Sequence, residues 1–144
     1  MDGTFITHGG LLVYLLFAAG KDIRTRKVST RLAQGAVWAA VLLWIFFRPM
    51  GLAEWVFGLL PGLFVLLVGC ISGEAIGYGD GIVTLVCGLF LGFWGCLQVL
   101  VFGLFFSGPV SLYLICSGRA HRKSRIPFVP FLVLGYIGWL VMRM

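Results

Sequence analysis

Asp22 and Asp80 are the two residues of this sequence best placed to do chemistry together. The chain has only five acidic residues, and Asp80 stands where a long apolar run begins, in the stretch Gly77-Tyr78-Gly79-Asp80. A carboxylate inside a membrane-spanning helix costs about 2.5–3.5 kcal/mol at the helix centre and less near the interface. That cost marks Asp80 as a functional residue, and Asp22 is its predicted partner.

Two carboxyl groups held close together cannot both ionise readily, so they share a proton. The ionised group can then activate a water molecule while the protonated group polarises a peptide carbonyl, as in aspartyl proteases. Gly77 and Gly79 have no side chains and would let an extended peptide approach the backbone. Tyr78 would hold the same loop at the membrane interface. The sequence therefore predicts Asp22 and Asp80 as catalytic, and Gly77, Tyr78 and Gly79 as substrate-binding or loop-positioning residues.

A second interpretation gives the same residues only structural roles. Asp80 would then cap the helix that follows it. Asp22 would form an ion pair with Lys21 or Arg26, its neighbours in the sequence. Glu74 is expected to be an exposed loop acid rather than a third catalytic group.

The amino-acid composition is unusually apolar, and it indicates which kind of secondary structure positions these residues. Of the 144 residues, 60% are hydrophobic and only 11% are charged, with a mean hydropathy of +1.05. A soluble domain has close to half apolar and about a quarter charged residues. The composition predicts an all-α, polytopic membrane protein in contact with the lipid bilayer, formed as a single membrane-embedded domain over residues 1–144.

The positive net charge is explained by membrane topology rather than by nucleic acid. Nine of the eleven basic residues fall within the segments 21–31 and 119–125. Clustered cations of this kind are typical of cytoplasmic loops, so no nucleic-acid partner is expected. The four cysteines form no Cys-x-x-Cys pair, and neither a metal site nor a disulfide framework is indicated.

Apolar runs divide the chain into six predicted transmembrane helices. The run from Gly81 to Ser117 is too long for one span, and we expect it to break near Gly92-Phe93-Trp94-Gly95. The six spans cover residues 5–20, 32–47, 55–71, two halves of 81–117, and 127–142. Because the loops after the first and fifth spans hold nine cations, the odd-to-even loops are predicted to be cytoplasmic and both termini extracytoplasmic. Asp22 and Asp80 then lie at the cytoplasmic face.

Glycine spacing predicts which helix faces meet. In the third span and just beyond it, Gly58, Gly62, Gly69 and Gly73 are 4, 7 and 4 residues apart, and Gly77, Gly81, Gly88 and Gly92 repeat this spacing. Small residues at such intervals let helix backbones approach closely inside a membrane. We therefore expect the third and fourth spans to pack tightly.

Three motifs, in order, resemble those of the type IV prepilin peptidases, a family of Gly-x-Gly-Asp membrane aspartyl proteases. Asp22 follows the first span, and Gly77-Tyr78-Gly79-Asp80 opens the fourth. Residues 126–132, Ile-Pro-Phe-Val-Pro-Phe-Leu, look like the family's signature before its last span. The resemblance covers nearly the whole chain.

The resemblance implies a leader peptidase of the cytoplasmic membrane, without cofactor or metal. It would cleave the class III signal peptide of a prepilin or pseudopilin at the cytoplasmic face, with Asp22 and Asp80 as the catalytic pair. The chain departs from the family pattern at Val28-Ser29-Thr30 and at Ile82, where the family usually has Ile-Pro-Asn and Lys. It also lacks the cysteine-rich domain of the larger, bifunctional members, so no methyltransferase activity is expected.

Two functions of other classes remain open at this point. A non-catalytic membrane assembly factor would keep the fold and bind pilin-like helices, and the missing lysine at Ile82 favours it. A small transporter would need charged groups near the middle of the membrane, and the sequence offers almost none.

Overall fold

A computed structural model of the chain describes residues 2–25, 30–47, 51–72, 78–118 and 128–143. Within these ranges every regular element is helical, which confirms the predicted all-α class. The helices are α1 (Asp2–Thr25), α2 (Thr30–Phe47), α3 (Leu52–Phe57), α4 (Leu59–Ile71), α5 (Tyr78–Cys116) and α6 (Val129–Arg143).

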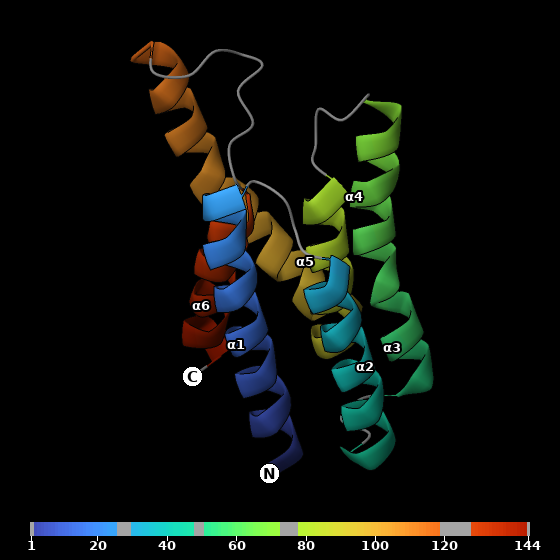
Figure 1. Cartoon of the computed structure of the whole chain (residues 1–144). Coiled ribbons are helices and arrows are strands. Elements are labelled where there is room, and N and C mark those ends of the chain that lie inside the picture. Colours follow the sequence, from blue (N-terminus) through green and yellow to red (C-terminus); the bar gives the residue numbers. More distant parts are fainter. Residues whose placement is uncertain (1, 26–29, 48–50, 73–77, 119–127, 144) are drawn as a thin grey trace.

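The long helix α5 consists of two arms that meet at Gly92. Gly92 has φ 72° and ψ −176°, a backbone conformation that residues with a Cβ rarely adopt. The two arms run in opposite directions from this point, so α5 has the shape of a V (Figure 1). The predicted break near Gly92 is therefore confirmed. Because of this bend, α5 contributes two separate helical segments to the bundle.

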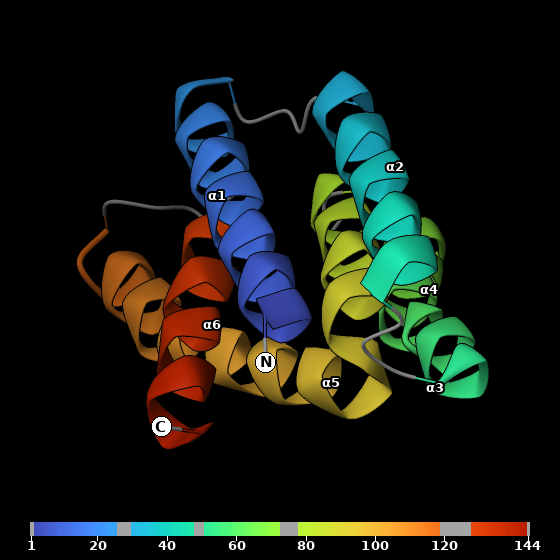
Figure 2. The same ribbon diagram turned by 90° about the horizontal axis from the view of Figure 1, so that it is seen from below.

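The arms of α5 join two groups of helices. Seen from below, α1 and α6 lie together on one side, and α2 lies with α3 and α4 on the other (Figure 2). The α3 and α4 helices are separated only by Gly58 and continue one another as the predicted third span. Trp44 of α2 stacks on Trp55 of α3 with ring centroids 5.2 Å apart.

The first helix is longer than its apolar run predicted. We expected residues 21–31 to be a polar loop, but α1 continues through Lys21, Asp22 and Arg24 to Thr25. Basic side chains stabilise the negative end of the helix dipole, so helical structure outlasts the hydrophobic pattern here. Asp22 consequently lies on a helix and not in a loop.

The helix ends divide between two ends of the molecule. The two termini and the bend of α5 lie at one end, and the end of α1 and the starts of α5 and α6 lie toward the other (Figure 1). Among the residues described, the segments Leu52–Ile71 and Tyr78–Cys116 are long and apolar enough to cross a membrane, whereas Arg31–Phe47 and Val129–Arg143 are shorter apolar helices. The count of six spans and the orientation of the termini stay predictions.

Glycines bring α4 and α5 into backbone contact, as their spacing predicted. A Cβ added at Gly88 would collide with the carbonyl oxygen of Gly58, and one added at Gly62 would come within 2.5 Å of the Leu85 backbone nitrogen. Gly81 similarly leaves room for the side chain of Leu66. Close packing of this kind lets dispersion forces join helices where lipid removes the hydrophobic drive. It fixes the first arm of α5, which begins near Asp80.

The pairing of α1 with α6 relies on a buried tyrosine. Tyr136 of α6 is fully buried, and its hydroxyl donates to the backbone oxygen of His8 at 3.0 Å and lies 3.2 Å from His8 Nδ1. Leu11 and Leu15 of α1 are also fully buried. The first and last helices of the chain are thereby held side by side.

The glycine contact between α4 and α5 can be tested with two matched substitutions. Gly88→Ala should lower thermal stability in detergent, because the new methyl group has no space and overpacking typically costs 1–3 kcal/mol. Gly35→Ala places the same methyl group where nothing lies within 4 Å. It should raise stability by about 0.5–1 kcal/mol through helix propensity. Equal effects of the two substitutions on the melting temperature would contradict the packing.

Candidate active site

Asp22 is held at the junction of α1 and α6. Its side chain is only 6% exposed, and the backbone N–H of Val129, the first residue of α6, donates a hydrogen bond to its carboxyl group. The amides of a first helical turn have no partner within the helix, so a carboxylate there satisfies one of them. The second oxygen, Oδ2, is buried and has no hydrogen-bond partner among the residues that the structure describes. Within that part of the chain, one oxygen of Asp22 is anchored and the other makes no hydrogen bond.

Asp80 lies in the first turn of α5 and is half-buried. The backbone around it is fixed by Thr84, whose hydroxyl donates to the carbonyl oxygen of Asp80 at 2.7 Å. Thr84 is itself 1% exposed, and its own carbonyl accepts a hydrogen bond from the Cys96 thiol across the bend of α5 at 3.4 Å. Both arms of α5 therefore support the turn that carries Asp80.

The two carboxyl groups are electrostatically coupled at the ends of their helices, outside the expected spans. Burial raises the pKa of Asp80 to about 7, and the nearby charge of Asp22 adds to this rise. Burial also raises the pKa of Asp22, while the hydrogen bond from Val129 opposes the rise. Near neutral pH this arrangement favours one proton shared by the pair.

The structure describes some of the residues beside Asp80 but not all of them. Gly77 lies outside the described residues. Tyr78 is the first residue of α5 and is 44% exposed, and Gly79 is half-buried beside it. Ile82, at the position where a lysine was expected, is half-buried in the next turn of α5. An exposed aromatic residue therefore stands two positions before Asp80.

The structural interpretation of Asp80 as a helix cap is not what the structure has. Asp80 lies inside the first turn of α5 and not at the capping position before it. For Asp22, the backbone amide of Val129 is a hydrogen-bond donor among the described residues. Arg26, one of its expected ion-pair partners, lies outside the described residues.

Sequence reasoning missed the two residues that support the carboxyl pair, Val129 and Thr84. Val129 was noted only as part of the motif at residues 126–132, of which Pro130 falls in the first turn of α6. A proline at that position marks a helix start and therefore free backbone amides, which was the available signal. No comparable signal pointed to Thr84, because its hydroxyl bonds only to the backbone of its own helix.

Comparison with known proteins finds a matching family. The model of one family, the type IV leader peptidase family, matches residues 10–112, which include Asp22 and Asp80. Neither a curated protein nor a solved structure matches the chain significantly.

The burial of Asp80 predicts how stability depends on pH. Its pKa is about 7 in the folded chain against an ordinary value of 3.8, so between these values the folded state binds more protons than the unfolded state. The free energy of unfolding should therefore fall as pH rises through this window. Asp80→Asn should flatten that slope in thermal unfolding scans in detergent from pH 4 to 8. Tyr78→Phe, a change in the same turn that leaves both carboxyl groups, should keep the wild-type slope. A slope unchanged by Asp80→Asn would contradict the assignment.

Proposed function

Because the chain belongs to the type IV leader peptidase family, we propose that it is a membrane aspartyl endopeptidase that removes the leader peptide of pilin-like proteins. Asp22 and Asp80 form the catalytic pair. The observation that carries this proposal is the coupling of the two carboxyl groups, since the charge of Asp22 adds to the rise that burial causes in the pKa of Asp80. A pair that shares one proton is the working unit of aspartyl proteolysis.

The unequal surroundings of the pair support a division of the two chemical roles. Asp22 is the general base, because the Val129 amide stabilises its ionised form. Asp80 is the general acid, because its raised pKa of about 7 lets a substantial fraction of it carry a proton near neutral pH. Asp22 takes a proton from a water molecule, whose oxygen attacks the scissile carbonyl carbon while Asp80 donates a hydrogen bond to the carbonyl oxygen. The tetrahedral intermediate breaks its C–N bond as the leaving nitrogen gains the proton that Asp22 took from the water, which returns Asp22 to its ionised form.

The substrate is the class III signal peptide of a prepilin or pseudopilin, cleaved at the cytoplasmic membrane face. The family supplies the leader peptide as substrate class. The cytoplasmic face is inferred from the basic residues, which gather in the segments 21–31 and 119–125 on either side of the proposed site in the sequence. A carboxyl pair between the end of α1 and the start of α5 would meet a peptide where it leaves the membrane.

Leader removal tests the catalytic pair directly. The protein is co-expressed with a prepilin from the same genome, and cleavage is followed by gel shift and N-terminal sequencing. Asp22→Asn and Asp80→Asn should each lower the cleavage rate by about 10²-fold or more, the contribution of a lost general base or acid. Glu74→Gln removes an acid from the neighbouring sequence and should cleave at the wild-type rate.

Two results would contradict the proposed pair. Cleavage that persists in either aspartate variant at matched membrane levels would exclude the dyad. Pilus assembly that needs the protein but is unaffected by both substitutions would favour the assembly-factor function, to which the departure at Ile82 points.

The Val129 amide can be separated from the Val129 side chain by two substitutions. Val129→Pro removes the N–H that stabilises ionised Asp22, so the pKa of Asp22 rises and the acidic limb of the rate profile shifts to higher pH. Proline is tolerated structurally in the first turn of a helix. Val129→Ala keeps the amide and should leave the limb in place, although the loss of a fully buried side chain lowers stability. Identical pH profiles for the two variants would exclude the hydrogen bond.

A further inference from the structure

A second site lies at the opposite end of the bundle from Asp22 and Asp80. A cavity of about 670 Å³ opens between α3, the second arm of α5 and the last turn of α6. This end of the molecule also holds both termini and the bend of α5 (Figure 1). In the proposed membrane orientation the cavity faces the lipid–water interface opposite the carboxyl pair.

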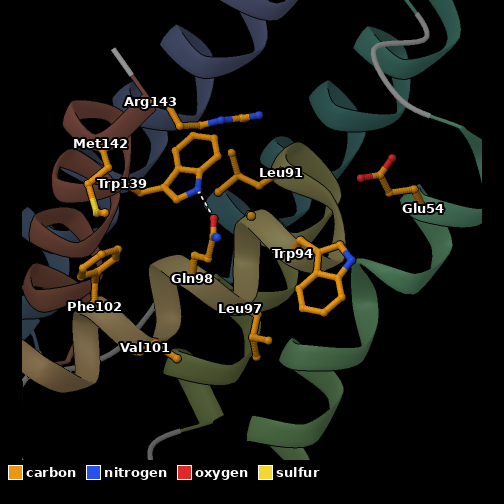
Figure 3. A pocket seen from close by; sticks show the side chains of 11 residues that line it. Glu54, Leu91, Trp94, Leu97, Gln98, Val101, Phe102, Trp139, Met142 and Arg143 are labelled. Atoms are coloured by element: carbon orange, nitrogen blue, oxygen red, sulfur yellow. Dashed lines mark hydrogen bonds between the residues drawn. The ribbon is translucent and has the colours of Figure 1, made fainter.

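The lining combines a mostly apolar wall with three polar side chains. Glu54 comes from α3, Gln98 from α5 and Arg143 from α6 (Figure 3). Trp94 is 67% exposed and projects beside the cavity, as tryptophans do where membrane meets water. The remaining apolar contacts are suited to hydrocarbon and are Leu91, Leu97, Val101, Phe102 and Met142.

Arg143 is held in place by a chain of contacts. Its guanidinium lies 4.8 Å from the ring centroid of Trp139, which is 3% exposed. The Trp139 Nε1–H donates to Gln98 Oε1 at 2.7 Å. Because that oxygen is occupied, the amide N–H groups of Gln98 are left to donate to a ligand. Two donors of the same cavity, one of them charged, are therefore positioned before any ligand arrives.

The carboxylate of Glu54, on α3, places a negative charge in the cavity that also contains the positive charge of Arg143. Figure 3 shows Glu54 and Arg143 on opposite sides of the cavity, with Leu91 and Trp94 between them in this view. A ligand that carries an anion and a cation a few atoms apart can satisfy both groups, whereas a purely anionic ligand would meet the charge of Glu54 unpaired. Arginine is well suited to phosphate oxygens, and a carboxylate beside an aromatic ring suits an ammonium group.

We propose that this cavity binds the headgroup and upper acyl chain of a zwitterionic phospholipid, phosphatidylethanolamine. Arg143 and Gln98 bind the phosphate, and Glu54 with Trp94 binds the ammonium group. The acyl chain lies on the apolar wall of α5 and Met142. The assignment rests on the membrane placement proposed above, and it does not depend on Asp22 and Asp80 being catalytic.

Lipid retention on the purified full-length chain tests the site. The protein is reconstituted in nanodiscs with equal amounts of phosphatidylethanolamine and phosphatidylglycerol, and the retained lipids are counted by native mass spectrometry. Wild type should retain phosphatidylethanolamine over phosphatidylglycerol by about tenfold, the effect expected of one charge-assisted contact. Glu54→Gln should lose this preference, and Arg143→Gln should lose both lipids while Arg143→Lys keeps them in part.

The controls separate this site from general lipid binding and from catalysis. Arg31→Gln removes an exposed cation at the start of α2 and should retain lipid as wild type does. Asp80→Asn should also retain lipid as wild type does. The cleavage assay and the lipid assay therefore test the two proposals independently. Equal retention of the two lipids by wild type, or an unchanged preference in Glu54→Gln, would overturn the proposal. So would full competition by soluble phosphoethanolamine, since the acyl chain would then have no part in binding.

Discussion

The free-energy cost of burying carboxyl groups in an apolar bundle governs the rest of this structure. Asp22 is almost fully enclosed, and only a proton or a strong donor can offset the loss of its hydration. In a protein made of helices, unpaired backbone donors occur only at helix starts. The start of α6 must therefore meet the end of α1, and the start of α5 must lie beside both. The burial of the Asp22 and Asp80 carboxyl groups therefore constrains how α1, α5 and α6 are placed.

Glycine makes that arrangement mechanically possible. The contact between Gly58 and Gly88 ties the first arm of α5 to the neighbouring rod formed by α3 and α4. The positive φ of Gly92 then turns the chain back, so that the second arm reaches α6. Gly103 and Gly135 repeat the close approach there, since a Cβ at Gly135 would lie 2.8 Å from the Gly103 nitrogen. The first arm of α5 thus packs against α3 and α4, and its second arm packs against α6.

Much of the fold could be predicted from the sequence because its strongest signals are local. Apolar run length gave the helical class, a glycine-rich stretch gave the bend near Gly92, and glycine spacing gave the contact of α4 with α5. Local signals failed at the end of α1, because the helix continues from Lys21 to Thr25 after its apolar run has ended. They failed again for the amide of Val129 and for the cavity between Glu54 and Arg143. Those features join residues far apart in the chain and have no periodicity of their own.

The bond between Val129 and Asp22 also bears on how the protein is made. Asp22 belongs to α1, which is synthesised before α6, the helix that Val129 begins. Until α6 has been inserted beside α1, Asp22 lacks the Val129 amide that stabilises its ionised form. A partly synthesised chain carries both aspartates without the setting that differentiates them. Under the proposed function, a chain without α6 would carry both aspartates but lack the donor that makes Asp22 the general base.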